Sequence, residues 1–184
     1  SSATGNYTSV RPVRTSAGTW TVFYKVEKTN YETVTGSSTI KIQKKAIPSI
    51  KLSTNVYTYT GRKIKPRITC SGLKEGQNYT VEYANNYMPG SGRITVTGVG
   101  NYSGKRTAKF TIVPKAVAKV SAVLYGHNDV KITWQSSKGA SGYKVYIKQG
   151  TGSYRLEKTT KGLSYRAENL KEGKTIAVKV VPYV

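Results

Sequence analysis

Cysteine and histidine are almost missing from this sequence of 184 residues, which has one of each, Cys70 and His127. A lone cysteine excludes an intramolecular disulfide and therefore a disulfide-stapled scaffold. Nucleophilic catalysis needs a serine or cysteine beside a base, most often histidine. His127 falls in the turn-like run 126–129, and Cys70 is expected to behave as a small apolar residue at a strand end. We therefore predict that the chain is not an enzyme and has no catalytic residue.

Acidic side chains are also few. Asp129 is the only aspartate, and the seven glutamates are scattered along the chain. A metal site needs His, Cys or carboxylate groups clustered at ligand spacing. The glycine-rich run 98–104 lies between expected strands and opens no helix, so it lacks the geometry of a phosphate-binding loop. We predict neither a metal site nor a cofactor.

Long apolar runs are absent as well. No run approaches the length of a transmembrane helix, so we expect no membrane span in this chain. Ser1 opens no signal peptide, and for an exported protein we expect the signal and any wall anchor to lie outside this sequence. Hydrophobic residues make up 37%, which predicts thin cores repeated along the chain rather than one large core.

Positive charge, in contrast, is abundant, with 30 Lys and Arg against 8 Asp and Glu, a formal net charge of +22. Residues 1–47 carry 7 basic and 2 acidic groups, residues 48–114 carry 10 and 2, and residues 115–184 carry 13 and 4. Such a field attracts anionic polymers. The even spread is unlike a nucleic-acid-binding tail, and no known nucleic-acid-binding motif is present. We expect no specific nucleic-acid partner.

The remaining pattern is that of β-strands. Apolar and polar residues alternate in the runs 130–134, 143–148 and 176–180, and glycine-containing turns separate these runs. Tyrosine is frequent, at 15 residues, and stretches that favour helices are nearly missing. Several short strands with regular turn signals predict an all-β chain of sandwiches.

Two proline-containing segments, 44–48 and 113–116, divide the chain into three expected modules. Each follows an alternating run, 39–42 or 109–112, and proline suits the exit of a strand into a linker. The order Thr21-Val22, Asn30-Tyr31 and Ile40 before the first linker parallels 95–96, 101–102 and 110 before the second. We predict modules at residues 1–47, 48–114 and 115–184, joined by short hinges.

The second module contains a long, ordered series of motifs: YTGRKIKP at 59–66, LKEGQNYTVEY at 73–83, ITVTG at 94–98, GNYSG at 100–104 and FTI at 110–112. In these motifs it resembles the immunoglobulin-like repeats of Gram-positive bacterial surface proteins. The first module is similar to the later strands of a related repeat, with its early strands missing. The resemblance implies tandem immunoglobulin-like sandwiches and a structural role for the sequon asparagines Asn78 and Asn101.

The third module resembles bacterial fibronectin type III modules through VKITW at 130–134, GASGYKVY at 139–146 and LKEG at 170–173. Trp134 then stands in the core of the second strand, with Tyr143 and Val145 beside it. Ile176 occupies the place of the corner tyrosine, and Val184 is reached where the last strand is expected to begin.

These resemblances imply an extracellular or cell-surface protein. Our leading hypothesis is a non-catalytic modular segment that acts as a stalk or adhesive region towards a host surface ligand. The alternative is a carbohydrate- or cell-wall-polymer-binding accessory region of a larger extracellular enzyme. For an anionic wall polymer or polysaccharide, the candidate binding residues combine exposed cations with one tyrosine: Lys144, Tyr146, Lys148, Arg62, Lys63, Lys65 and Arg67.

Overall fold

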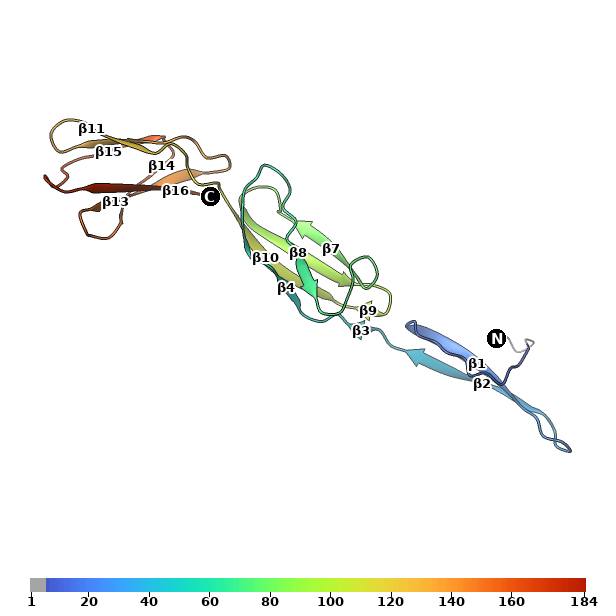
Figure 1. Ribbon diagram of the computed structural model, residues 1–184. Coiled ribbons are helices and arrows are strands. Elements are labelled where there is room, and N and C mark those ends of the chain that lie inside the picture. The colour runs from blue at the N-terminus through green and yellow to red at the C-terminus, as the bar shows by residue number, and fades with distance from the viewer. Residues whose placement is uncertain (1–5) are drawn as a thin grey trace. The chain divides into compact units, whose positions relative to one another are not determined.

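The computed structural model describes residues 6–184 as β-strands joined by turns and extended connections (Figure 1). Within this range no residue is helical, so the predicted all-β fold class is confirmed. A search of the described residues finds no helix with the length and apolar character needed to cross a membrane.

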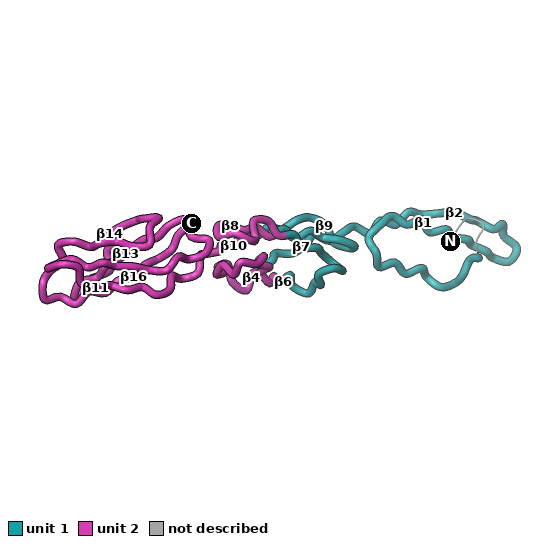
Figure 2. Tube along the Cα trace, turned by 90° about the horizontal axis from the view of Figure 1, so that it is seen from above, with its two compact units in different colours: residues 1–51, 70–82, 95–107 teal, residues 52–69, 83–94, 108–184 magenta. Residues whose placement is uncertain are grey.

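The chain forms two compact units, coloured separately in Figure 2. The first unit consists of residues 1–51, 70–82 and 95–107, and the second of residues 52–69, 83–94 and 108–184. The expected division into three modules stays a prediction.

The N-terminal part of the first unit is a two-stranded antiparallel ladder. Strands β1 (Gly18–Val26) and β2 (Val34–Ile42) pair along their whole length, from Gly18↔Ile42 to Val26↔Val34. The pleat places Trp20, Val22 and Tyr24 on one face with Ile40 and Ile42. The other face combines Phe23 with threonine, serine and lysine. The two modules differ in burial at a position that the sequence parallel matches. Ile40 is 48% exposed, whereas its counterpart Phe110 is 1% exposed.

The middle of the chain contributes eight strands. They are β3 (Lys45–Ala46), β4 (Ile50–Leu52), β5 (Val56–Thr58), β6 (Ile68–Cys70), β7 (Tyr79–Ala84), β8 (Gly90–Gly98), β9 (Tyr102–Ser103) and β10 (Lys105–Val113). Four form a sheet in the order β5-β10-β8-β7, and the pairs β4-β6 and β3-β9 form two small sheets. Ile94, Val96, Phe110 and Ile112 alternate along β8 and β10 and are buried.

The segment 44–48, expected to be a short hinge, contributes a strand to a small sheet. Its residues Lys45 and Ala46 form β3, which runs parallel to β9. The Lys45 and Ile47 N–H groups donate to the carbonyl oxygens of Asn101 (2.8 Å) and Ser103 (2.9 Å). Pro48 follows directly after the last of these bonds, where no further donor is needed.

The last six strands form two three-stranded sheets. They are β11 (Ser121–Leu124), β12 (Val130–Thr133), β13 (Gly142–Gln149), β14 (Arg155–Thr160), β15 (Ser164–Ala167) and β16 (Ile176–Tyr183). The strand orders are β11-β12-β15 and β14-β13-β16. Among the described strands, β16 has one neighbour, β13.

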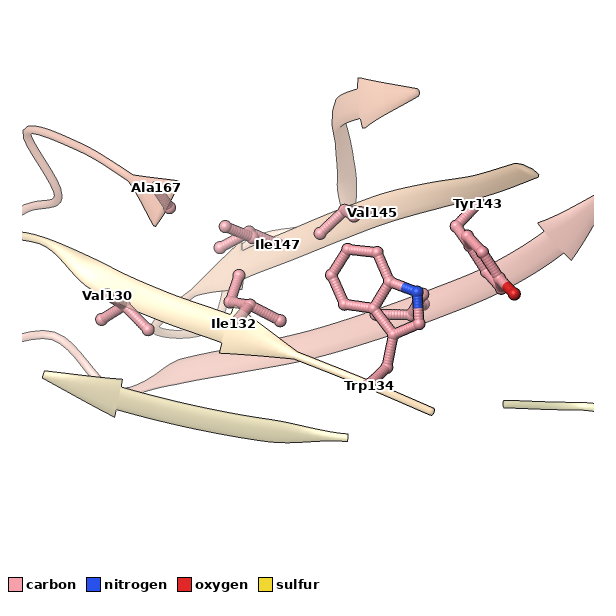
Figure 3. Packing of buried hydrophobic residues seen from close by; sticks show 8 residues of the cluster. Val130, Ile132, Trp134, Tyr143, Val145, Ile147 and Ala167 are labelled. Atoms are coloured by element: carbon pink, nitrogen blue, oxygen red, sulfur yellow. The ribbon is translucent and has the colours of Figure 1, made fainter. Parts of the chain in front are cut away.

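Side chains from both sheets form one buried core, shown in Figure 3. Val130, Ile132 and Trp134 come from β12 and the residue that follows it, and Tyr143, Val145 and Ile147 come from β13. The Trp134 and Tyr143 rings meet edge to face, with their centroids 5.6 Å apart. The predicted core of Trp134, Tyr143 and Val145 is confirmed.

Replacing Trp134 by alanine should lower the free energy of unfolding of the C-terminal sandwich by about 3–5 kcal/mol, because it deletes a buried aromatic side chain. Trp134→Phe should cost less, since the indole N–H is buried without a hydrogen-bond partner among the described residues. Denaturant unfolding followed by the dispersion of amide resonances of β12 and β13 measures both effects. Trp20→Ala, in the half-exposed β1–β2 ladder, is the control and should leave that transition unchanged.

Candidate polyanion-binding face

The outer face of β13 presents three of the predicted binding residues together. Tyr143, Val145 and Ile147 point into the core, so the pleat directs Lys144, Tyr146 and Lys148 to the opposite face, where all three are half-buried. The predicted grouping of these three side chains on one face is confirmed.

Three further residues, which sequence reasoning missed, extend this face. Lys179 of β16 stands opposite Tyr146 in the register, with its Nζ 5.9 Å from the Tyr146 ring centroid. The Nζ of Lys144 lies 5.8 Å from the ring centroid of Tyr183. The Nζ of Lys148 lies 5.9 Å from that of Tyr154. Each lysine on this face is thus within cation–π range of a tyrosine.

The alternation in 176–180 already contained a signal for Lys179, because it places that residue away from the core. That Lys179 lies beside Tyr146 depends on the pairing of β16 with β13, which is a contact between segments distant in the sequence. Tyr154 lies in the connection before β14, where no periodicity indicates its direction.

The hydroxyl end of the Tyr183 ring lies against Gly142, its cross-strand partner. Gly142 pairs with Tyr183 in the β13–β16 ladder. A Cβ atom at position 142 would stand 2.5 Å from the Tyr183 hydroxyl oxygen and 2.7 Å from the ring carbon that bears it. The ring therefore covers the Gly142 backbone, and any larger residue at position 142 would force the ring to move.

The charge of this face is positive and uncompensated on two of its three strands, the central strand β13 and the edge strand β16. Strands β13 and β16 contain Lys144, Lys148 and Lys179 and no aspartate or glutamate. The acidic residue of the sheet is Glu157, in the edge strand β14. A bound anion would meet three ammonium groups without displacing an internal ion pair.

The other four predicted residues lie on a separate segment, the connection between β5 and β6. Its backbone is anchored where Ile64 N–H donates to the Asn86 carbonyl (2.7 Å) and Tyr83 donates to the Pro66 carbonyl (3.2 Å). The exposed cations beside these anchors are Arg62, Lys63, Lys65 and Arg67. Within residues 6–184, no hydrogen bond, ion pair or ring contact links them to the face of β13, so they form a second surface.

A further aromatic and cationic cluster lies on the β11-β12-β15 sheet. The Arg166 guanidinium stands 4.7 Å from the Tyr125 ring centroid, but it also donates to Asp129 Oδ2 at 2.6 and 3.0 Å. Asp129 Oδ1 accepts from Asn169 N–H (3.2 Å). The Arg166 hydrogen bonds hold the pKa of the Asp129 carboxyl below its ordinary value. The arginine is already neutralised and is a weaker anion site than the lysines of β13 and β16.

The two residues considered for nucleophilic chemistry lie apart from this face. His127 lies in the turn between β11 and β12. Cys70 ends β6 and is 3% exposed, and burial raises the pKa of its thiol, against the opposing effect of Arg106. In the part of the chain that the structure describes, no three His, Cys, Asp or Glu side chains gather into a possible metal site.

The sequon asparagines at 78 and 101 are both engaged in hydrogen bonds. Asn78 Oδ1 accepts from Lys74 N–H at 2.9 Å. Asn101 Oδ1 accepts from Ala17 N–H at 2.7 Å, and its Nδ2 donates to the Thr15 carbonyl at 2.9 Å. These contacts agree with the structural role expected for both side chains.

No protein-family model matches the chain, and no curated protein matches its sequence. The immunoglobulin-like and fibronectin type III-like identities therefore stay predictions, carried by the motifs quoted above.

The Asp129–Arg166 pair predicts a specific acid sensitivity. A carboxyl whose pKa is lower in the folded state stabilises the fold above its unfolded pKa, near 3.8, and loses that contribution as the pH falls through the folded value. Asp129→Asn keeps an Oδ1 acceptor but removes the charge. The difference in unfolding free energy between wild type and variant should shrink as the pH is lowered from about 5 to about 2. Glu172→Gln is the control, and a constant difference for Asp129→Asn would contradict the prediction.

Proposed function

We propose that the chain is a non-catalytic modular segment of a bacterial cell-surface or secreted protein, acting as a stalk or adhesive region. The observation that carries the proposal is that both connecting segments are hydrogen-bonded to the strands beside them. A spacer must keep its modules at a fixed separation, and fixed connections do so better than flexible Gly/Ser linkers.

The first connection is organised by Asn101, within the first unit. The Asn101 side chain holds Thr15 and Ala17, which precede β1, and its backbone carbonyl accepts from Lys45, which follows β2. One residue thus holds both strands at the open end of the β1–β2 ladder, where Gly18 pairs with Ile42.

The second connection is held within the second unit. Ser137 is buried, and its hydroxyl donates to the Lys115 carbonyl at 2.5 Å, while its N–H donates to the Tyr143 hydroxyl at 2.9 Å. The Gln135 N–H donates to the carbonyl oxygen of Ala118 (3.0 Å), and the Tyr59 N–H donates to that of Val113 (2.8 Å). Residues 113–118 are therefore held from two sides.

Replacing Asn101 should loosen the first connection in a graded way. Asn101→Ala removes both side-chain bonds, so the Ala17 amide should exchange with solvent faster, by about tenfold for a loss of about 1.4 kcal/mol of local stability. Asn101→Asp retains the acceptor for Ala17 and loses the donor to Thr15, so Ala17 should stay protected while residues 14–16 gain mobility. Hydrogen exchange and ¹⁵N relaxation measure these two effects.

Asn78→Ala is the matched control, because the side-chain hydrogen bond that it removes, from Lys74 N–H, lies within the Asn78 loop. It should leave the Ala17 amide unchanged. An Ala17 amide that is equally protected in Asn101→Ala would contradict the proposed fixed connection.

A second candidate function is a carbohydrate- or cell-wall-polymer-binding accessory region of a larger extracellular enzyme. The specific observation in its favour is the face of β13 and β16, where three lysines lie beside three tyrosines without an acidic residue on either strand. An anionic polymer would release its counterions on contact with these ammonium groups.

Binding to an anionic polymer should therefore weaken steeply with salt. The logarithm of the association constant should fall linearly with the logarithm of the NaCl concentration, as expected for counterion release. At about 0.15 M the Debye length is roughly 8 Å, so only contacts at the surface should remain. Calorimetric titration with polygalacturonate at several salt concentrations tests this. Salt-independent binding would indicate a shaped sugar pocket instead, and no binding at low salt would remove this second candidate.

A further inference from the structure

The outer face of the β14-β13-β16 sheet carries cations and rings in alternation. The face also carries Val181, opposite Lys144, and Leu156, opposite Tyr146. Following β13 from Gly142, its cations and rings are Tyr183, Lys144, Tyr146 with Lys179 opposite, Lys148, and then Tyr154. We call these six residues the Lys–Tyr stripe.

The spacing of charge along the stripe is wide. Successive outward residues of a strand lie about 7 Å apart, because the rise is about 3.4 Å per residue. The stripe therefore suits an extended anionic chain, which can reach the three ammonium groups in succession, better than it suits a single small anion.

The rings add a second requirement for the ligand. The Tyr183 ring lies against Gly142 and is half-buried, Tyr146 is half-buried, and Tyr154 is 46% exposed. Flat tyrosine rings give sugars an apolar surface for stacking, and lysines at the same place pair with carboxylates. A polypeptide such as polyglutamate offers the carboxylates alone, and a neutral polysaccharide offers the sugar rings alone.

We propose that the Lys–Tyr stripe binds a linear acidic polysaccharide, whose carboxylates pair with Lys144, Lys148 and Lys179 while its sugar rings stack on the three tyrosines. This inference rests on the second candidate function above and specifies its ligand. The stacking surface depends on Gly142, because a side chain there would displace the ring of Tyr183.

The test uses the full chain and four polymers of similar length in about 0.05 M NaCl. Polygalacturonate has a carboxylate on each ring, its methyl ester keeps the rings without the charge, polyglutamate has the charge without the rings, and oligo(dT) represents nucleic acid. We expect polygalacturonate to bind at least about tenfold more tightly than each of the others.

Variants separate the contribution of the rings from that of the charges. Tyr146→Ala with Gly142→Ala should reduce polygalacturonate binding to the polyglutamate level and leave polyglutamate binding unchanged. Lys144→Gln with Lys179→Gln should weaken binding of both polymers. Lys109→Gln with Lys161→Gln removes the same charge from exposed positions outside the stripe and should have a much smaller effect. Gly142→Ala alone displaces the Tyr183 ring while keeping every tyrosine in the chain. Its control is Gly162→Ala, where a Cβ atom meets no other atom closer than 3.4 Å.

Each of the other outcomes overturns a stated part of the proposal. Equal affinity for polyglutamate and polygalacturonate would overturn the acidic polysaccharide and leave polymer binding by charge. Tighter binding of oligo(dT) would replace the polysaccharide by nucleic acid. No binding of any polymer would overturn both this inference and the second candidate function, whereas the stalk is tested separately by the exchange of Ala17.

Discussion

Burial of Tyr143, Val145 and Ile147 on the inner side of β13 determines what the other side of that strand presents. A strand has two faces and a period of two, so the packing that holds the C-terminal sandwich together also directs Lys144, Tyr146 and Lys148 outward. A shift of one residue in register would exchange the faces and bury the lysines, at a cost that the small core could not offset. The binding face is thus a consequence of the core.

Aromatic rings laid over glycines recur along the chain. Tyr24 covers Gly36, Phe110 covers Gly92, and Tyr183 covers Gly142; a Cβ atom at any of these glycines would lie within 2.7 Å of a ring carbon. The Gly36 and Gly142 contacts are between directly paired residues of neighbouring strands. With few large apolar side chains available, covering backbone with an aromatic ring excludes water from a sheet without needing a thick core.

Local alternation was enough to predict the all-β fold, the burial of Trp134 and the outward face of β13. It failed where the structure depends on contacts between distant segments. The pairing of Lys45 and Ala46 with β9 joins residues that are more than 50 positions apart. A strand of two residues is also too short to show an alternating pattern in the sequence. Lys179 and Tyr183 belong to the binding face only because β16 is the neighbour of β13. The order of strands in a sheet cannot be predicted from the sequence of either strand alone.

The clamp at Asn101 has a mechanical consequence. Tension that enters the chain before Thr15 reaches Asn101 through Thr15 and Ala17, and it leaves through Lys45, which is bonded to the same residue. The nine paired positions of the β1–β2 ladder lie between these two attachment points and are bypassed by the load. While the clamp holds, the ladder is shielded from unzipping; once it breaks, the ladder opens as a reserve of extra length.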